Sequence, residues 1–305
     1  MLLPTRNLPI FLSLCILPLP SVLAWGNIGH RTVAYLAQMY LSPGATTYVS
    51  ALLGDTDISD AAVWADEVRR THEFHYTAGW HFIDAEDDPP RTCQVSFDRD
   101  CHPGPGCVVG AIVNMTERVN DPDLSSYDKG NALKFLLHFI GDVHQPLHTE
   151  GEDKGGNGIE VEWGRKRTNL HAVWDSMIIE KLIGWRPKDD EQSYAKDWAS
   201  KLYGANARGL QLGSECDDVQ NAQGCALGWA SEANRQVCDY VLKDDVAGVE
   251  GQDLSGDYYD GAVPVVEDLI GKAGRRLAAW INALAAQGAS MVEEDRFRVQ
   301  PVEEL

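Results

Sequence analysis

The most informative residues of this 305-residue chain are two histidine–aspartate pairs, each separated by four positions. The pairs are His138 with Asp142 and His171 with Asp175, and His148 lies between them. A separation of four places both side chains on one face of a helix, one turn apart. Imidazole nitrogens and carboxylate oxygens are ligands that suit zinc. Two such pairs in a chain with nine histidines predict more than one metal ion, and therefore hydrolytic metal chemistry.

Three further ligand candidates lie in the N-terminal part of the chain: His30, Asp66 and His81. Asp66 lies in an amphipathic segment, and His81 lies among aromatic and acidic residues at positions 80–84. Taken singly, a histidine near a helix start is more often a cap or a core residue than a ligand. They are ligand candidates only because they accompany the two histidine–aspartate pairs and His148.

The elements expected to position these residues are mostly helical. Ser42 and Pro43 begin a helix that Gly54 ends. Apolar residues recur at helical spacing along the rest of the chain, at 33–41, 61–68, 109–119, 133–143, 170–183, 194–202, 229–242 and 263–284. The one clear strand, 159–163, is expected to pair with the segment after Arg167 through a turn at Gly164, and 80–106 is loop-like. The sequence predicts a mainly α, single-domain protein with a small β-hairpin and a metal cleft between helices.

The first 24 residues have the features of a secretory signal peptide. Arg6 supplies the positive region, residues 10–19 are apolar but too short to span a bilayer, and residues 22–24 form a cleavage site. The alternative is a buried N-terminal strand. We expect a secreted protein whose mature chain begins at Trp25, with a catalytic domain over 25–290 and a charged, disordered tail over 291–305.

The cysteine count fits an exported protein. Of seven cysteines, Cys15 is removed with the signal, and an even remainder indicates disulfides rather than metal ligands. Spacing does not choose among the pairings; two pairs could close locally and would leave a long-range third, namely Cys101–Cys107, Cys216–Cys225 and Cys93–Cys238. Asn114 begins an Asn-Met-Thr sequon for glycosylation.

The formal net charge of −20 argues against passive nucleic-acid binding through basic patches. It does not exclude a nucleic acid as substrate, because several aspartates would be metal ligands and each zinc restores two positive charges at the site.

The candidate residues lie in motifs that closely resemble the secreted zinc-dependent single-strand nucleases of fungi and plants, the S1/P1 type within the zinc phospholipase C superfold. The matching motifs occur in order along the whole mature chain, at 25–30, 64–66, 80–84, 138–148, 155–157 and 169–175.

The resemblance implies three zinc ions per chain. The first would be held by Asp66, His81, His138 and Asp142. The second would be held by His148, His171 and Asp175. The third would be held by His30, a bridging Asp142, and the backbone amine and carbonyl of Trp25. That α-amine is free only after cleavage at Ala24, so signal removal would complete the site.

The resemblance also implies the reaction. The enzyme would be an endonuclease that hydrolyses single-stranded DNA and RNA to 5′-phosphate products, with 3′-nucleotidase activity as well. A hydroxide held by zinc would attack phosphorus, and Asp66 could orient it. Arg69 matches a phosphate contact, although its alternative is a solvated partner of Glu73.

Phe82 and Asp84 match the base-binding residues of the family. An aromatic ring stacks on an unpaired base and a carboxylate accepts hydrogen bonds from base N–H groups, which gives a physical reason for single-strand preference. The alternative is a core phenylalanine and a capping aspartate. The glycine-rich run around Asn157 is more typical of a turn than of a phosphate loop, although Asn157 could line the cleft. We expect His144 to be structural, because it faces away from the His138–Asp142 side of the helix.

Two other functions compete with a nuclease. A zinc phospholipase C would share the superfold, but family members tend to carry glutamate where this chain has Asp175. A secreted zinc-binding or surface protein that has lost activity is the other alternative, although no expected ligand is missing. We further expect a monomer that does not associate with membranes.

Overall fold

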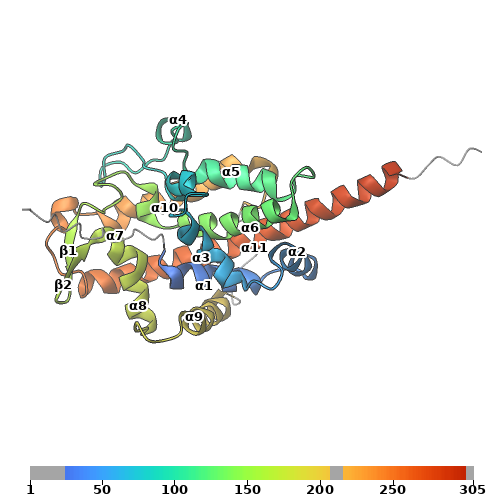
Figure 1. Ribbon diagram of the computed structural model, residues 1–305. Coiled ribbons are helices and arrows are strands. Elements are labelled where there is room, and N and C mark those ends of the chain that lie inside the picture. The colour runs from blue at the N-terminus through green and yellow to red at the C-terminus, as the bar shows by residue number, and fades with distance from the viewer. Residues whose placement is uncertain (1–24, 207–215, 300–305) are drawn as a thin grey trace, which may run out of the picture.

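A computed structural model of the chain describes residues 25–206 and 216–299. The proposed signal peptide therefore lies outside the described residues. The described part is mainly helical with one two-stranded sheet (Figure 1), as predicted. Its longer helices are α1 (Asn27–Gln38), α2 (Pro43–Leu53), α3 (Ile58–Val68), α5 (Val108–Val119), α6 (Ser126–Asp142), α9 (Glu191–Asn206), α10 (Ala222–Gln236) and α11 (Asp257–Val299).

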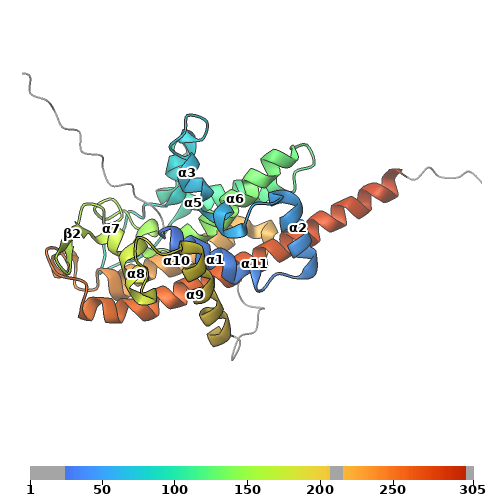
Figure 2. The same ribbon diagram turned by 60° about the horizontal axis from the view of Figure 1, so that its bottom comes forward.

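Helix α6 is the centre of the fold. Ser125 caps the start of α6, because its hydroxyl accepts a hydrogen bond from Asp128 N. The residues of α6 from 130 onward are almost all buried. A helix that is apolar around its circumference must be enclosed on all sides, and α6 packs against α1, α2, α3, α5 and α11. The last turn of α6, which carries two candidate ligands, therefore lies inside the molecule (Figure 2).

Helix α1 brings the N-terminal end of the described chain to this interior, because it packs between α9, α11 and α3. The next helix, α2, has the predicted ends. Ser42 Oγ accepts a hydrogen bond from Ala45 N at 3.1 Å, Pro43 is the first helical residue, and Gly54 ends the helix with φ +61°. Gly54 can adopt this left-handed conformation because it has no Cβ.

The last helix, α11, runs the length of the molecule (Figure 1). It continues to Val299, so residues 291–299 are helical where the sequence analysis expected disorder. The physical reason is local propensity: this segment contains two Glu and two Arg, which extend a helix readily. Residues 300–305 lie outside the described residues.

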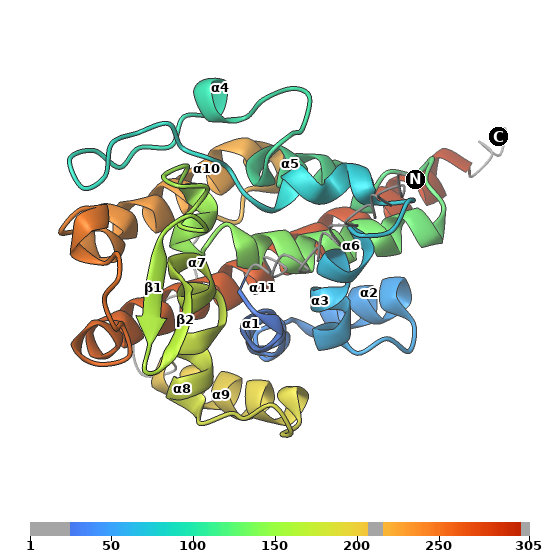
Figure 3. The same cartoon turned by 60° about the vertical axis from the view of Figure 1, so that its left-hand side comes forward.

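The hairpin consists of β1 (Glu160–Trp163) and β2 (Lys166–Asn169), antiparallel, with Glu160 paired to Asn169. Gly164 has φ +61° in the turn, as the sequence predicted. The hairpin lies beside the short helix α7 (Leu170–Ala172), as Figure 3 shows. Strand β2 is followed directly by the segment that contains His171 and Asp175.

The loop-like region contains one short helix, α4 (Phe97–Asp100), and two of the three disulfides in the described residues hold it. The three bonds are Cys93–Cys238, Cys101–Cys107 and Cys216–Cys225, which confirms the pairing that the sequence left open. The first bond ties the loop after Asp84 to the helical turn that follows α10. None of the helices in the described ranges has the length and apolar character needed to cross a bilayer.

Candidate metal centre and substrate cleft

The two predicted pairs have the geometry that their spacing requires. Near the end of α6, His138 Nε2 lies 3.2 Å from Asp142 Oδ2. His171, in α7, has its Nε2 3.1 Å from Oδ2 of Asp175. Asp175 lies in a π-helical turn, η3 (Val173–Met177), between α7 and α8 (Ile178–Ile183). The sequence predicted an uninterrupted helix here; no residue pattern marked the π turn, a feature often found at functional sites.

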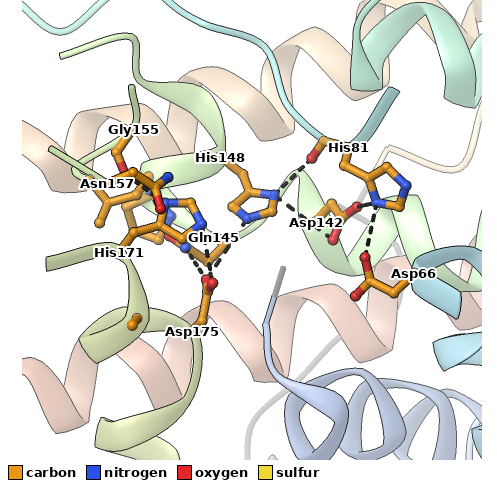
Figure 4. Close-up of polar contacts among 12 residues, drawn as sticks. Asp66, His81, Asp142, Gln145, His148, Gly155, Asn157, His171 and Asp175 are labelled. Carbon is orange, nitrogen blue, oxygen red and sulfur yellow. Dashed lines mark hydrogen bonds and ion pairs between the residues drawn. The ribbon is translucent and has the colours of Figure 1, made fainter. Parts of the chain in front are cut away.

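Asp142 is the residue on which the N-terminal candidates converge. Its Oδ1 lies 3.2 Å from His30 Nε2 on α1, and its Oδ2 lies 3.1 Å from His81 Nδ1. His81 is the last residue of a 3-10 helix, η1 (His75–His81). Asp66, on α3, has its Oδ1 3.7 Å from His81 Nδ1 and 3.8 Å from His138 Nε2. Figure 4 shows Asp66, His81 and Asp142 pointing toward one another from separate elements.

Backbone carbonyls fix the orientation of three of the imidazole rings. In His138, His148 and His171, Nδ1 contacts a carbonyl oxygen, which assigns the proton to Nδ1 and leaves Nε2 as a free electron-pair donor. The carbonyls are those of Ala62, His81 and Gly155, at 2.7, 2.7 and 2.6 Å respectively.

Gly155 shows why a glycine is needed at one of these carbonyls. It has φ +60°, and a Cβ on it would lie 2.5 Å from Leu147 O. Only a residue without a side chain lets the loop approach this closely. The preceding Asp153 and Lys154 also have positive φ values, 44° and 62°. A tightly curled loop therefore orients the ring of His171.

Several buried atoms at this site have no hydrogen-bond partner, and a metal cation would account for them. They include His148 Nε2 and His171 Nε2, and also His30 Nε2 and Asp142 Oδ1, which lie 3.2 Å apart as an ion pair. Orphaned buried polar atoms are costly in a folded protein. The ligand atoms lie within 4.8 Å of one another in three groups: His30, Asp66 and His138; His81, His138 and Asp142; and His148, His171 and Asp175. This donor set of imidazoles and carboxylates fits zinc.

Burial and neighbouring charges shift the pKa values of the candidate ligands in both directions. Burial would raise the pKa of Asp142, but the charge of His138 and contacts from three histidines outweigh it and hold that pKa well below its usual value. Burial lowers the pKa of His148 to about 3, so its ring is a neutral ligand at ordinary pH. Burial raises the pKa of Asp175 to about 6, against the opposing effect of His171.

Trp25, the proposed N-terminal residue of the mature chain, lies beside this centre. Its side chain is fully buried, and the next residue, Gly26, donates its backbone N–H to Asp175 O at 2.7 Å. A Cβ on Gly26 would lie 2.4 Å from Ser176 Oγ. The chain therefore enters the fold in close contact with a segment that carries a candidate ligand.

A cavity of 490 Å³ lies over the candidate ligands. Its lining residues are Arg69, His81, Phe82, Asp84, Leu147, His148, Lys154, Gly155, Asn157, Gly158, Asn169 and His171. Three of the candidate ligands, His81, His148 and His171, line the cavity, so a molecule in it would touch the proposed metal centre.

Phe82 and Asp84 share one face of an extended segment. Ile83 N donates to His148 O at 2.8 Å, and Val108 N donates to Phe82 O at 2.9 Å. Because side chains alternate along an extended backbone, Ile83 is buried while Phe82 and Asp84 are exposed toward the cavity. Phe82 is 38% exposed. The alternative of a core phenylalanine is therefore wrong.

Two cationic side chains line the cavity. Arg69 lies 3.1 Å from Asp66 Oδ1 through one guanidinium nitrogen. Lys154 is the second cation, and the sequence analysis missed it. Its position directly before the Gly155–Asn157 motif was the available signal. Asn157 lines the cavity too, and its amide donates to Lys154 O at 2.8 Å.

The cavity adjoins a second one of 430 Å³, which shares Phe82 and Asp84 with it and has a strongly acidic wall. Its carboxylates are Asp84, Glu86, Asp87, Asp100, Glu150, Glu152 and Asp153. A polyanion is repelled from this side. Arg69 and Lys154 line the first cavity and not the second, so a phosphate chain is attracted to the first cavity.

His144 lies away from the candidate ligands, as expected. Its Nδ1 lies 2.7 Å from Ile140 O, and its Nε2 lies 2.9 Å from a guanidinium nitrogen of Arg276 on α11. Nδ1 therefore contacts the last turn of α6, while Nε2 links this region to α11. His72, His75 and His102 belong to none of the three ligand groups.

Comparison with known proteins gives a family for this arrangement. The family model described as S1/P1 Nuclease matches residues 25–286. Nuclease P1 of Penicillium citrinum is 42% identical over 264 residues, which cover 85% of this chain and 97% of that protein. Nuclease S1 of Aspergillus oryzae is 40% identical over 267 residues (86% and 92%), and Endonuclease 4 of Arabidopsis thaliana is 34% identical over 277 residues (87% and 90%). The comparisons support the nuclease and not the phospholipase C alternative. The chain belongs to the S1/P1 nuclease family, whose members are zinc-dependent hydrolases of phosphodiester bonds.

Proposed function

We propose that this protein is a secreted, zinc-dependent endonuclease that cleaves single-stranded DNA and RNA to 5′-phosphate products and also acts as a 3′-nucleotidase. The observation that carries the proposal is the convergence of eight buried or nearly buried histidine and aspartate ligands beneath a cavity that exposes an aromatic ring. The ligands are His30, Asp66, His81, His138, Asp142, His148, His171 and Asp175.

We assign three zinc ions to these residues. One is held by Asp66, His81, His138 and Asp142, the second by His148, His171 and Asp175, and the third by His30, Asp142 and the backbone of Trp25. The contacts of Asp142 Oδ1 with His30 and of Asp142 Oδ2 with His81 support its role as a bridge. When bound, zinc lowers the pKa of a coordinated water and neutralises charge on phosphoryl oxygens.

The chain's own residues orient the substrate. Arg69 lies at the cavity wall beside Asp66, where a guanidinium can bind a phosphate oxygen through paired N–H groups. Asp66, whose Oδ1 lies 3.1 Å from Arg69, accepts a hydrogen bond from the attacking nucleophile and so orients it. Asn157 offers an amide in the lining of the same cavity.

The base of the nucleotide is bound by Phe82 and Asp84. The exposed ring offers a face for stacking, and the carboxylate two residues away accepts hydrogen bonds from base N–H groups. In a duplex the base faces are covered by neighbouring bases, so the site favours an unpaired strand.

We further propose that removal of residues 1–24 exposes the α-amine of Trp25, that the protein is a monomer, and that Asn114 is glycosylated. The start of the family match at residue 25 supports the first point, and the exposure of Asn114 on α5 supports the last. Three disulfides support an oxidising, extracellular location.

The test combines metal analysis with activity. Protein that begins at Trp25 should contain close to three zinc ions per chain and should cleave single-stranded DNA much faster than duplex DNA. Full activity with one zinc per molecule would reject the three-zinc assignment. Equal rates on both DNA forms would reject the proposed base site as the source of specificity.

A further inference from the structure

Gln145 occupies the corner between two groups of proposed ligands. It follows the end of α6 and precedes a short 3-10 helix, η2 (Pro146–Thr149), and its side chain is fully buried. Its backbone N–H donates to Asp142 O at 2.9 Å, and its backbone carbonyl accepts from His148 N at 2.9 Å. The main chain of Gln145 thus contacts one ligand residue on each side.

The side-chain amide of Gln145 reaches a third ligand residue. Nε2 donates to Asp175 Oδ1 at 2.6 Å, and Oε1 accepts from Leu147 N at 2.6 Å (Figure 4). These two partners fix the orientation of the amide, because the reversed amide would place oxygen against oxygen and N–H against N–H. Both hydrogen bonds lie in the interior, where leaving either partner unpaired is costly.

From these contacts we infer that Gln145 is a positioning residue for the proposed zinc site of His148, His171 and Asp175. By holding Asp175 Oδ1, the amide leaves Oδ2 facing His171 Nε2, 3.1 Å away. By capping η2, the same amide fixes the turn that carries His148. The Gln145 side chain therefore sets the relative placement of His148 on η2 and Asp175 on η3. The Gln145 backbone N–H connects the same corner to Asp142.

This role is distinct from substrate binding. Gln145 is absent from the lining of the 490 Å³ cavity, and its four hydrogen bonds are all with this chain. Groups that hold metal ligands through hydrogen bonds commonly change metal affinity by about 10–100-fold when they are replaced. The inference rests on the proposed zinc assignment, so its readout must be zinc binding as well as activity.

The first test is Gln145→Glu, which keeps the size of the side chain and its acceptor for Leu147 N. It replaces the donor to Asp175 with a second carboxylate oxygen. We expect the affinity for one zinc, measured by competition with a chromophoric chelator, to fall about 10–100-fold. We also expect kcat to fall while KM for single-stranded DNA changes little. Asn120→Asp is the matched control, because the Asn120 amide also links two separate helices. Its Oδ1 accepts a hydrogen bond from the Tyr48 hydroxyl on α2, and its Nδ2 donates to Leu284 O on α11. Asn120 does not line the cavity.

A second variant, Gln145→Met, decides the matter if the glutamate variant does not fold. It has a similar length and introduces no charge, and we expect a smaller but measurable loss of zinc affinity. The rise in Tm on adding zinc to chelated protein should shrink in both variants, because ligand stabilisation follows affinity. Unchanged zinc affinity in both variants, with Tm lowered equally with and without zinc, would make Gln145 a packing residue and overturn the inference. A parent protein without zinc at this site would overturn the zinc assignment too.

Discussion

Asp142 Oδ1 lies 3.2 Å from His30 Nε2, and this contact joins the end of α6 to the first helix of the described chain. The ring of His30 also stacks on that of His138, with 3.9 Å between ring centroids. Both residues are fully buried. The contact brings the segment that begins at Trp25 to the candidate metal centre, because His30 lies only five positions after Trp25.

The first prediction concerns the bridging role of Asp142. Asp142→Asn removes a negative charge proposed to be shared by two zinc ions while preserving the shape of the side chain. We expect kcat/KM to fall at least ~100-fold, since even outer-shell changes at metal sites cost about 10–100-fold. Zinc content should fall in parallel. Near-normal activity with full zinc content would contradict the ligand assignment at this position.

The second prediction concerns the N-terminal amine. A protein with extra residues before Trp25 should bind one zinc fewer and turn over slowly, because an amide nitrogen is a poor metal ligand. The control is the same protein with a protease site that releases Trp25, and cleavage should restore both zinc content and rate. Parental turnover from a confirmed extended N-terminus would remove Trp25 from the site.

The sequence predicted the ligand pairs on α6 and α7–η3 because a spacing of four is a local property of helices. The contacts of His30 and His81 with Asp142, and of Asp66 with His81 and His138, join residues far apart in the chain. No local spacing contains that information. The resemblance to the nuclease family supplied it. The role of Gln145 was missed for a different reason. Gln145 lies just beyond the apolar segment 133–143 and is not of a residue type that commonly binds zinc, and its partner Asp175 lies on another element.

A third prediction separates base binding from metal binding. Stacking on an aromatic ring contributes roughly 1–3 kcal/mol per base, so Phe82→Ala should raise KM for single-stranded DNA or RNA about tenfold or more. Zinc content should stay the same. Tyr203→Ala is a matched control, because Tyr203 is also 38% exposed but does not line the cavity.

Asp84→Ala should act differently from Phe82→Ala. Its hydrogen bonds would read the base edge, so the variant should alter the preference among homopolymers more than the overall rate. Unchanged KM and unchanged base preference in both variants would mean that single-strand preference arises from the shape of the cleft.

The fourth prediction concerns pH and stability at Glu232, away from the metal centre. Its carboxylate oxygens lie 2.6 Å from Lys272 Nζ and 2.6 Å from a guanidinium nitrogen of Arg276, with Asp268 and His144 beyond those cations. Burial would raise the pKa of Glu232, but the hydrogen bonds from the two cations lower it to about 2. A carboxyl whose folded pKa is depressed stabilises the fold above its unfolded pKa of about 4.5, and the stabilisation disappears as the pH falls toward 2.

Glu232→Gln should therefore lower Tm most at pH 6–7, and the difference from the parent should shrink steadily below about pH 4.5. Thermal unfolding of both proteins in chelator would keep the acid release of zinc out of the comparison. Glu117→Gln, on an exposed position of α5, provides the control and should show little pH dependence. A constant difference across this range would mean that Glu232 stabilises the fold by packing rather than by its charge.

The last prediction concerns Lys154, which lines the 490 Å³ cavity and directly follows Asp153 of the neighbouring acidic wall in sequence. If its ammonium contacts one phosphate of a bound strand, Lys154→Gln should raise KM at low salt. The slope of log(1/KM) against log salt should become shallower by about 0.7, the value for one phosphate contact on a single strand. Zinc content and kcat should be unchanged, because no proposed ligand contacts the lysine side chain. Lys188→Gln, at an exposed position outside the cavity, tests whether loss of any surface cation has the same effect. An unchanged salt slope in Lys154→Gln, or an equal change in Lys188→Gln, would mean that the strand does not pass over Lys154.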